Sequence, residues 1–303
     1  MHKPSFDPGL TRQFTTPVTR IINKDGTFNV RRTGGTWRDF HPYLHLINMT
    51  WGGFLGTVFL AYVVVNTLFA VGYFLMAPGQ LQGADGPSEL GRFLNDFFFS
   101  AHTLTTVGYG SISPKGLEGN ILAALESLTG VLAFAVATGL MYGRVARPST
   151  RLGFSEQMVM APYQEGQALE FRVLNRRPNS LMEVEAQVML MTVNPEDGKL
   201  TRKYELLKLE RPRVLFLALT WTVVHPIDNE SPFRNLTAED LDRLQAEVLI
   251  VLKGYDDTFS QTVISRHSYR HDEIVWDRRF SPAFRVDEDG TLVLEVHRIS
   301  EMA

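Results

Sequence analysis

The sequence predicts a protein of the membrane α + β class, with two transmembrane helices, a re-entrant helix between them, and a β-sandwich that follows. Three observations support this fold class. Residues 46–143 are strongly apolar, whereas the chain on either side is charged and mixed. From Ser149 onward apolar residues alternate with polar ones, which is typical of strands. The length of 303 residues suits two domains better than one.

These patterns divide the chain into four segments. We expect a flexible cytoplasmic tail over residues 1–36, an interfacial helix over 37–47, a transmembrane domain over 48–147 and a cytoplasmic β-sandwich domain over 148–303. The first segment is polar and has no apolar core, so we do not expect it to be a cleaved signal peptide.

Composition excludes several classes of function. The net charge of −3 gives no bulk attraction to nucleic acid. The absence of cysteine excludes disulfides, thiolate metal sites and cysteine nucleophiles. The histidines and acids of the second half show neither metal-ligand spacing nor a nucleophile motif. We therefore expect neither an enzyme nor a bound cofactor.

Two segments are long enough to cross a membrane. Residues 46–76 contain no charged side chain and exceed the roughly 20 residues that a bilayer core requires. Trp51 and Tyr73, near the two ends, suit the two interfaces. A buried soluble helix is the alternative, but such helices rarely run so long without a polar face. The second span covers residues 117–143, with Glu126 as its one interior charge.

Basic residues orient these spans. Arginines precede the first span and follow the second, while the connecting loop is balanced in charge, so both termini are expected in the cytoplasm, with the protein in the plasma (inner) membrane. Three arginines lie directly after the second span, and there we expect anionic lipid headgroups, including phosphoinositides, to bind. These predicted lipid contacts are Arg144, Arg147 and Arg151.

The segment before the first span, residues 37–47, mixes aromatic and charged side chains. It predicts an amphipathic helix lying at the interface, with a plain linker as the alternative. Pro42 must occupy its first turn or produce a kink.

Residues 93–114 connect the spans and carry the most specific motif. The apolar, aromatic-rich part up to Thr105 predicts a short helix that enters the membrane part-way. Irregular backbone is tolerated beyond it only where protein or water surrounds it. Four copies of TVGYG present rings of carbonyl oxygens that replace the hydration shell of K⁺, so the motif predicts a potassium filter in a homotetramer. The filter residues, which would contact the ions, are Thr106, Val107, Gly108, Tyr109 and Gly110.

The second span would line such a pore. Gly130 and Gly139 can bend it, or they can allow close packing of helices. Tyr142, near the cytoplasmic end, predicts a constriction that closes the path, with an interfacial tyrosine as the alternative.

A charged residue inside the second span must face protein or water. We expect Glu126 to meet His102 behind the filter and to make the filter sensitive to pH. The alternative is that each side chain is satisfied separately by backbone or water.

The second half predicts a β-sandwich, because many short strands are separated by turn signals. A short helix is expected over residues 237–244, with Thr237 as its cap. The expected strands cover residues 169–174, 184–193, 203–209, 214–224, 246–253, 259–269, 274–280 and 292–297.

With these parts in this order, the chain resembles inward-rectifier potassium channels, especially prokaryotic ones, from Trp37 to about Ile299. Apart from the filter, several short motifs carry the resemblance. They are WRD at 37–39, ARP at 146–148, WTVVHPID at 221–228, SP at 231–232 and DEIVW at 272–276.

The resemblance implies an immunoglobulin-like cytoplasmic sandwich whose tetramer extends the ion path, with gating by inner-helix and cytoplasmic-domain motions. Tyr142 matches the bulky gate position of the family, and Glu183 and Asp257 match acids of the cytoplasmic pore. Phe134 stands where strong rectifiers carry an acid that senses magnesium or polyamines, so strong rectification by these internal blockers is not expected. His102 replaces a usual glutamate.

A second hypothesis is a membrane-anchored receptor or scaffold whose β domain binds a partner and whose pore does not conduct. The intact TVGYG sequence argues against it.

Overall fold

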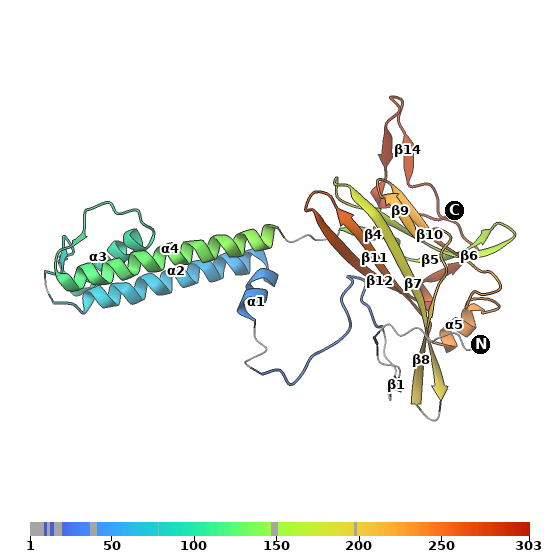
Figure 1. The fold of residues 1–303 in the computed structure, drawn as a ribbon, viewed down its shortest axis with the longest axis horizontal. Helices are drawn as coiled ribbons and strands as arrows, with labels where there is room; N and C mark the ends of the chain where they lie inside the picture. The colour runs from blue at the N-terminus through green and yellow to red at the C-terminus, as the bar shows by residue number, and fades with distance from the viewer. Residues whose placement is uncertain are drawn as a thin grey trace. The chain divides into compact units, whose positions relative to one another are not determined.

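The computed structural model describes residues 9–10, 13–14, 20–36, 41–77, 79–146, 151–196 and 199–303. The chain forms two compact units (Figure 1). The membrane unit comprises residues 34–147, and the β unit comprises residues 1–33 and 148–303.

The membrane unit contains four helices. They are α1 (Pro42–Asn48), α2 (Trp51–Phe74), α3 (Glu89–Leu104) and α4 (Leu117–Val145). Figure 1 shows α2 and α4 alongside each other, with α3 near one end of the pair. A small two-stranded pair, β2 (Leu81–Gln82) with β3 (Ser113–Pro114), brackets α3.

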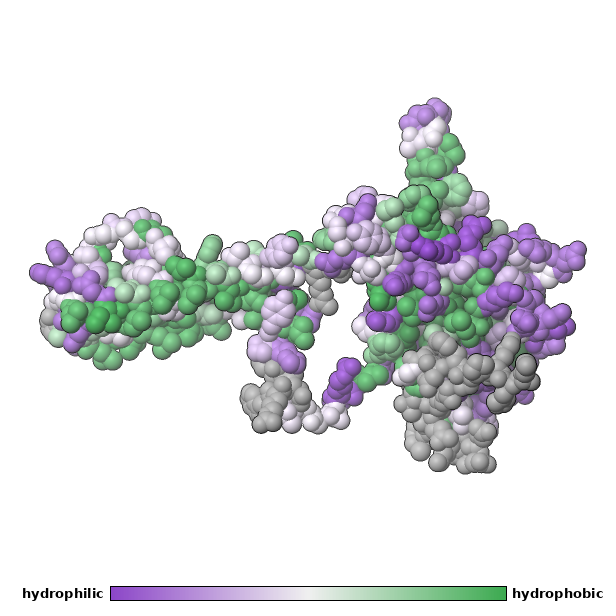
Figure 2. Space-filling model, in the orientation of Figure 1, coloured by the Kyte–Doolittle hydropathy of each residue, from purple (hydrophilic) through white to green (hydrophobic). Residues whose placement is uncertain are grey.

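Both α2 and α4 are long and apolar enough to cross a membrane, with mean hydropathies of 2.1 and 1.9. Only 17% of each apolar window is buried within the chain. Figure 2 shows this apolar surface along the helices. A core helix of a soluble protein would bury most of such a surface, so lipid or further subunits must cover it.

Capping residues fix the helix starts. The Thr50 hydroxyl accepts a hydrogen bond from the Gly53 amide at the start of α2, and Ser88 does the same for Gly91 at the start of α3. Pro42 lies in the first turn of α1, where its missing amide costs no hydrogen bond. Helix α1 falls at the predicted interfacial segment, of which residues 37–40 lie outside the described residues.

The β unit is a sandwich of two sheets, which confirms the predicted fold class. The larger sheet has the strand order β1-β8-β7-β11-β12, with β9 on β7, and the smaller has β10-β6-β5-β13, with β4 on β6. A separate hairpin pairs β14 with β15. The strands are β1 (Gln13–Phe14), β4 (Leu152–Phe154), β5 (Met158–Tyr163), β6 (Gly166–Asn175), β7 (Leu181–Glu196), β8 (Lys199–Leu206), β9 (Arg213–Phe216), β10 (Thr220–Pro226), β11 (Glu247–Asp256), β12 (Gln261–Arg270), β13 (Ile274–Trp276), β14 (Phe284–Val286) and β15 (Leu292–Leu294).

The main core lies between the two sheets. Side chains from the smaller sheet, such as Phe171 and Val173, share one buried cluster with Val188 and Ile250 from the larger sheet. Alternation along each strand supplies these inward side chains. Helix α5 (Ala238–Arg243) begins with a capping box in which Thr237 and Asp240 exchange hydrogen bonds, as its predicted cap suggested. Two short 3₁₀ turns, η2 (His271–Glu273) and η3 (Val296–Arg298), complete the unit.

Two expectations about the β unit need correction. The strand predicted over residues 214–224 is two strands, because β9 pairs with β7 in one sheet and β10 pairs with β6 in the other. The tail predicted to be flexible over residues 1–36 is in part ordered. Ile21 and Ile22 are buried, and their segment belongs to the β unit.

Candidate functional site

Helix α3 has 16 residues, too few to cross a bilayer, and it is anchored among the spans by its aromatic side chains. The Phe99 ring packs edge-on against Tyr73, with centroids 5.0 Å apart, and Phe93 packs similarly on Phe74. Arg92 donates to the Phe74 carbonyl at 2.9 Å. These contacts hold the half-helix against the end of α2.

The backbone of the predicted filter leaves α3 in an unusual conformation. Thr106, Gly108 and Gly110 have positive φ angles of 59°, 57° and 80°. Alternating such residues with ordinary ones turns successive carbonyls toward one side, and glycine adopts these angles at little cost. Thr106 is β-branched and strained there, a feature that the sequence did not predict.

Hydrogen bonds from α3 hold this strained start. The Thr106 amide donates to the Thr103 carbonyl at 3.0 Å, and the Val107 amide donates to the His102 carbonyl at 2.9 Å. The last turn of α3 therefore fixes the first residues of the predicted filter. Within this chain the Val107 and Tyr109 side chains are more than half exposed.

A buried polar network lies behind α3. Glu126 on α4 is fully buried and accepts a hydrogen bond from the Tyr73 hydroxyl at 2.6 Å. The Ser100 hydroxyl donates to its other oxygen. Ser100 also lies 3.1 Å from Oδ1 of Asn66, whose amide donates to the Tyr62 carbonyl. The network links α2, α3 and α4, and it satisfies a carboxylate that would otherwise be costly to bury.

The predicted contact between His102 and Glu126 is wrong. Within the described residues no hydrogen bond or ion pair joins them, because Tyr73 and Ser100 occupy the carboxylate. Residues two apart on a helix point to different sides, so Ser100 and His102 cannot both face Glu126. The His102 ring instead packs edge-on against Tyr109, with centroids 4.8 Å apart. The position of each residue around α3 could have indicated from the sequence that Ser100, and not His102, faces Glu126.

The two glycines of α4 differ in their surroundings. A Cβ atom added to Gly130 would lie 2.0 Å from the Leu104 carbonyl oxygen, so Gly130 permits close packing of α4 on the end of α3. An atom added to Gly139 meets nothing within 4 Å. Of the two alternatives, packing therefore describes Gly130, and bending stays available only for Gly139.

Phe134 and Tyr142 on α4 are about three-quarters exposed in the single chain, at 76% and 74%. Large aromatic side chains exposed to this degree on an apolar helix require cover from other molecules. The roles expected for them, in the inner cavity for Phe134 and at the gate for Tyr142, stay predictions.

Arg144 makes several contacts within the membrane unit, and its expected role in lipid binding stays a prediction. Its guanidinium donates to the main-chain carbonyls of Leu46, Ile47 and Met49. It also stacks within 4.8 Å of the Trp51 ring centroid. The carbonyls at a helix C-terminus lack partners and carry partial negative charge. Arg144 therefore ties the end of α4 to the corner between α1 and α2.

The other predicted lipid contacts differ from Arg144. Arg151 is exposed at the start of the β-rich segment. Arg147 lies outside the described residues.

The two predicted acids of the cytoplasmic pore lie at one end of the β7–β11 pair. Register places Leu181 opposite Asp256, so Glu183 and Asp257 lie close to the same end. Glu183 has a φ of 51°, next to a register shift, and pairs with exposed Arg213 at 2.8 Å.

Two apolar spanning helices are joined by a re-entrant half-helix and by a segment in which residues of positive φ alternate with ordinary ones. This combination is typical of an ion-channel subunit. Comparison with known sequences supports the same class of protein. The family model "Ion channel" matches residues 54–146, and the model "Inward rectifier potassium channel C-terminal domain" matches residues 152–303. The chain belongs to the inward-rectifier potassium channel family, which is a family of channels and not of enzymes.

Relatives span nearly the whole chain. The inward rectifier potassium channel Kirbac3.1 of Paramagnetospirillum magnetotacticum is 35% identical over 288 residues, covering 94% of this chain and 96% of the relative. The human G protein-activated inward rectifier potassium channel 2 is 28% identical, covering 94% and 72%. Among solved structures, the sporulation control protein Spo0M of Bacillus subtilis matches with a TM-score of 0.27 and 12% identity, covering 47% of this chain and 59% of Spo0M, which is too low to support an argument.

Proposed function

We propose that four copies of this chain form a K⁺ pore whose filter is Thr106–Gly110. The observation that carries this proposal is the set of left-handed residues at 106, 108 and 110, directly after a half-helix too short to span. One chain supplies one filter strand, and rings of carbonyls require several. The exposed apolar faces of α2 and α4 are consistent with such an assembly.

The gate of this pore is Tyr142, on the pore-lining helix α4. Four tyrosine rings at one level narrow the path and exclude water. Gly139 lies one turn earlier and has space to bend. Arg144 lies two residues later and is held by α1, so a displacement of α1 moves the helix end that carries the gate.

The cytoplasmic part of the ion path has acidic residues, but among the described residues it has no site that would bind internal Mg²⁺ or polyamines tightly. Glu183 and Asp257 would attract K⁺ and bind internal Mg²⁺ or polyamines weakly, since exposed charges are well screened. Phe134 adds no charge to the inner cavity. Strong rectification is therefore not part of this proposal.

Anionic lipids, including phosphoinositides, would act at the basic residues near the membrane, chiefly Arg147 and Arg151. Each such cation contributes about 1 kcal/mol near an anionic surface. In this proposal both termini lie in the cytoplasm and the protein lies in the plasma membrane, as the arginines that flank the spans suggest.

Potassium flux into liposomes tests the proposal. Gly108→Ala should abolish K⁺ flux, because alanine tolerates the φ of 57° poorly, while tetramers should persist in size analysis. Gly56→Ala is the matched control, since an added atom there on α2 meets nothing within 4 Å and should leave flux unchanged. Normal K⁺-selective flux through the Gly108 variant would refute the filter assignment.

A further inference from the structure

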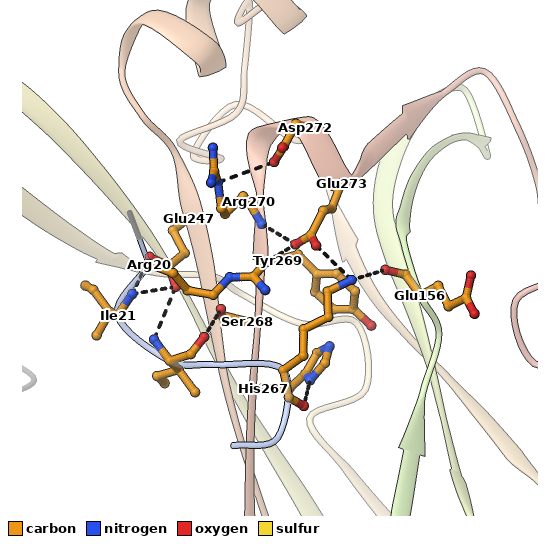
Figure 3. A network of polar contacts seen from close by, with 12 residues as sticks. Arg20, Ile21, Glu156, Glu247, His267, Ser268, Tyr269, Arg270, Asp272 and Glu273 are labelled. Atoms are coloured by element: carbon orange, nitrogen blue, oxygen red, sulfur yellow. Dashed lines mark hydrogen bonds and ion pairs between the residues drawn. The ribbon is translucent and has the colours of Figure 1, made fainter. Parts of the chain in front are cut away.

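Residues 20–29 fold into a small hairpin against the β unit, and we name this segment the N-terminal clasp. The Asn29 amide donates to the Ile21 carbonyl at 2.9 Å, and Ile22 bridges to Phe28. Figure 3 shows the start of the clasp beside β12, where its partners converge.

The β unit recognises the backbone of the clasp. The Glu247 carboxylate accepts from the Ile21 amide at 3.0 and 3.1 Å, and the Ile22 amide lies 3.4 Å away. The Ser268 hydroxyl donates to the Ile22 carbonyl at 2.6 Å, and Nδ1 of His267 lies 3.2 Å from the Lys24 carbonyl. A buried carboxylate receiving adjacent backbone amides forms strong, directional hydrogen bonds.

The clasp also fills an apolar patch on the outer face of the larger sheet. Ile21 and Ile22 are buried there in a cluster separate from the main core. The sheet side chains of this cluster are Met189, Met191, Val193, Tyr204 and Leu249. The sandwich core between the sheets is complete without the clasp.

Charge complements this patch at its edge. Arg20 and Lys24 both pair with Glu273, the latter at 2.7 Å, and the Lys24 ammonium also donates to the Glu156 carbonyl. The site therefore selects a segment that reads cation, isoleucine, isoleucine, polar residue, cation.

Two buried isoleucines and a few polar contacts must offset the ordering of about ten residues, and the two terms are of similar size. We infer that the clasp docks reversibly on the β unit and that docking controls how tightly this unit is tethered to α1. The tether between them, residues 30–41, reaches about 40 Å at most. Releasing the clasp adds at least ten residues, or about 35 Å.

The effect on the gate rests on the proposed function. Helix α1 holds Arg144, two residues from Tyr142. With a short tether, a displacement of the β unit also displaces α1. With a long tether the slack in the chain absorbs the displacement, and α1 does not move. Undocking should therefore change K⁺ flux.

The test uses the full-length protein and breaks the site from both sides. Ile21→Ser and Ile22→Ser remove the apolar anchors, and Glu247→Gln weakens the amide acceptor. Hydrogen exchange at the amides of residues 21 and 22, which both donate to Glu247, reports docking independently of conduction. Liposome flux reports coupling. Val30→Ser and Glu165→Gln, at neighbouring and distant exposed positions, are the matched controls.

The clasp variants should speed exchange of both amides at least tenfold, leave the amides of β7 and β11 protected, and change flux at least threefold in one common direction. Combining Ile21→Ser with Glu247→Gln should add little, because either change alone undocks the clasp. Unchanged exchange would overturn reversible docking. Faster exchange with flux within twofold of the parent would overturn coupling. A parent that conducts no K⁺ would refute the proposed function, while the exchange result would still decide docking.

Discussion

Glu126 in the membrane unit and Glu247 in the β unit are both buried carboxylates, but their donors come from different parts of the chain. Glu126 accepts from hydroxyls on two helices. Glu247 accepts from backbone amides of a separate segment. A carboxylate bound to side chains of packed helices joins elements that cannot separate without unfolding. A carboxylate bound to the backbone of a short segment can release it while the sheet stays intact.

The largest effect should follow removal of the membrane carboxylate. Glu126→Ala leaves the Tyr73 hydroxyl buried without an acceptor, at about 1–3 kcal/mol. The Ser100 hydroxyl keeps Asn66 as an acceptor, but the space left by the buried glutamate side chain adds the cost of a cavity. The proposed tetramer should dissociate at lower temperature, and K⁺ flux should fall with it. Thermal dissociation followed by gel mobility measures this. Glu118→Ala, on the exposed first turn of α4, is the control and should behave like the parent. Equal stability of the two variants would show that the network does not support the filter.

A smaller effect is expected in the β unit, whose free energy of unfolding should depend on pH. Burial lowers the pKa of His267 from 6.5 to about 4, and nearby Lys24 and Arg20 also lower it. The neutral imidazole is therefore favoured in the fold. Its contribution is complete above pH 6.5 and is lost as pH falls toward 4, by about 2 kcal/mol at pH 5 and about 3 kcal/mol at pH 4.

Thermal unfolding of the full-length protein between pH 7 and pH 4.5 tests this loss. Burial raises the pKa of Glu247, which acts in the opposite sense, so the variant comparison isolates the histidine. His267→Gln should flatten the acid loss, whereas His297→Gln, at an exposed position, should retain it. An identical pH dependence in both variants would exclude His267 as the source.

The smallest effect should be a difference in stability between alanine variants of the two glycines of α4. Gly130→Ala forces an atom against the Leu104 carbonyl and should lower the stability of the proposed tetramer by about 1–3 kcal/mol. Gly139→Ala has free space and should stabilise the helix by up to about 1 kcal/mol, while shortening channel openings. Tetramer dissociation and single-channel recording measure the pair. Equal stability changes would remove the distinction between packing and bending.

The sequence predicted what long or repeated patterns encode. Two spans, the re-entrant helix and most long strands follow from length, apolar content and alternation. Strand β5 was not predicted, because four of its six residues are buried in succession and the sequence there does not alternate between apolar and polar residues. The clasp was not predicted, because Ile21 and Ile22 are only two apolar residues in a polar stretch. The partner of Glu126 depended on helical phase, which places Ser100 rather than His102 toward it.

The passage of the chain from β9 to β10 has a mechanical consequence. Only residues 217–219 separate these strands, which pair in different sheets. The Leu217 amide donates to the Leu181 carbonyl of β7 at 3.0 Å, which holds Leu217 on the larger sheet. Only three Cα–Cα steps, no more than about 11 Å, then lead from Leu217 to Thr220 in the smaller sheet, and stacked sheets lie about 10 Å apart. The connection is therefore nearly taut. Neither sheet can slide over the other without breaking this link, so the sandwich transmits force as a stiff lever rather than as two sliding plates.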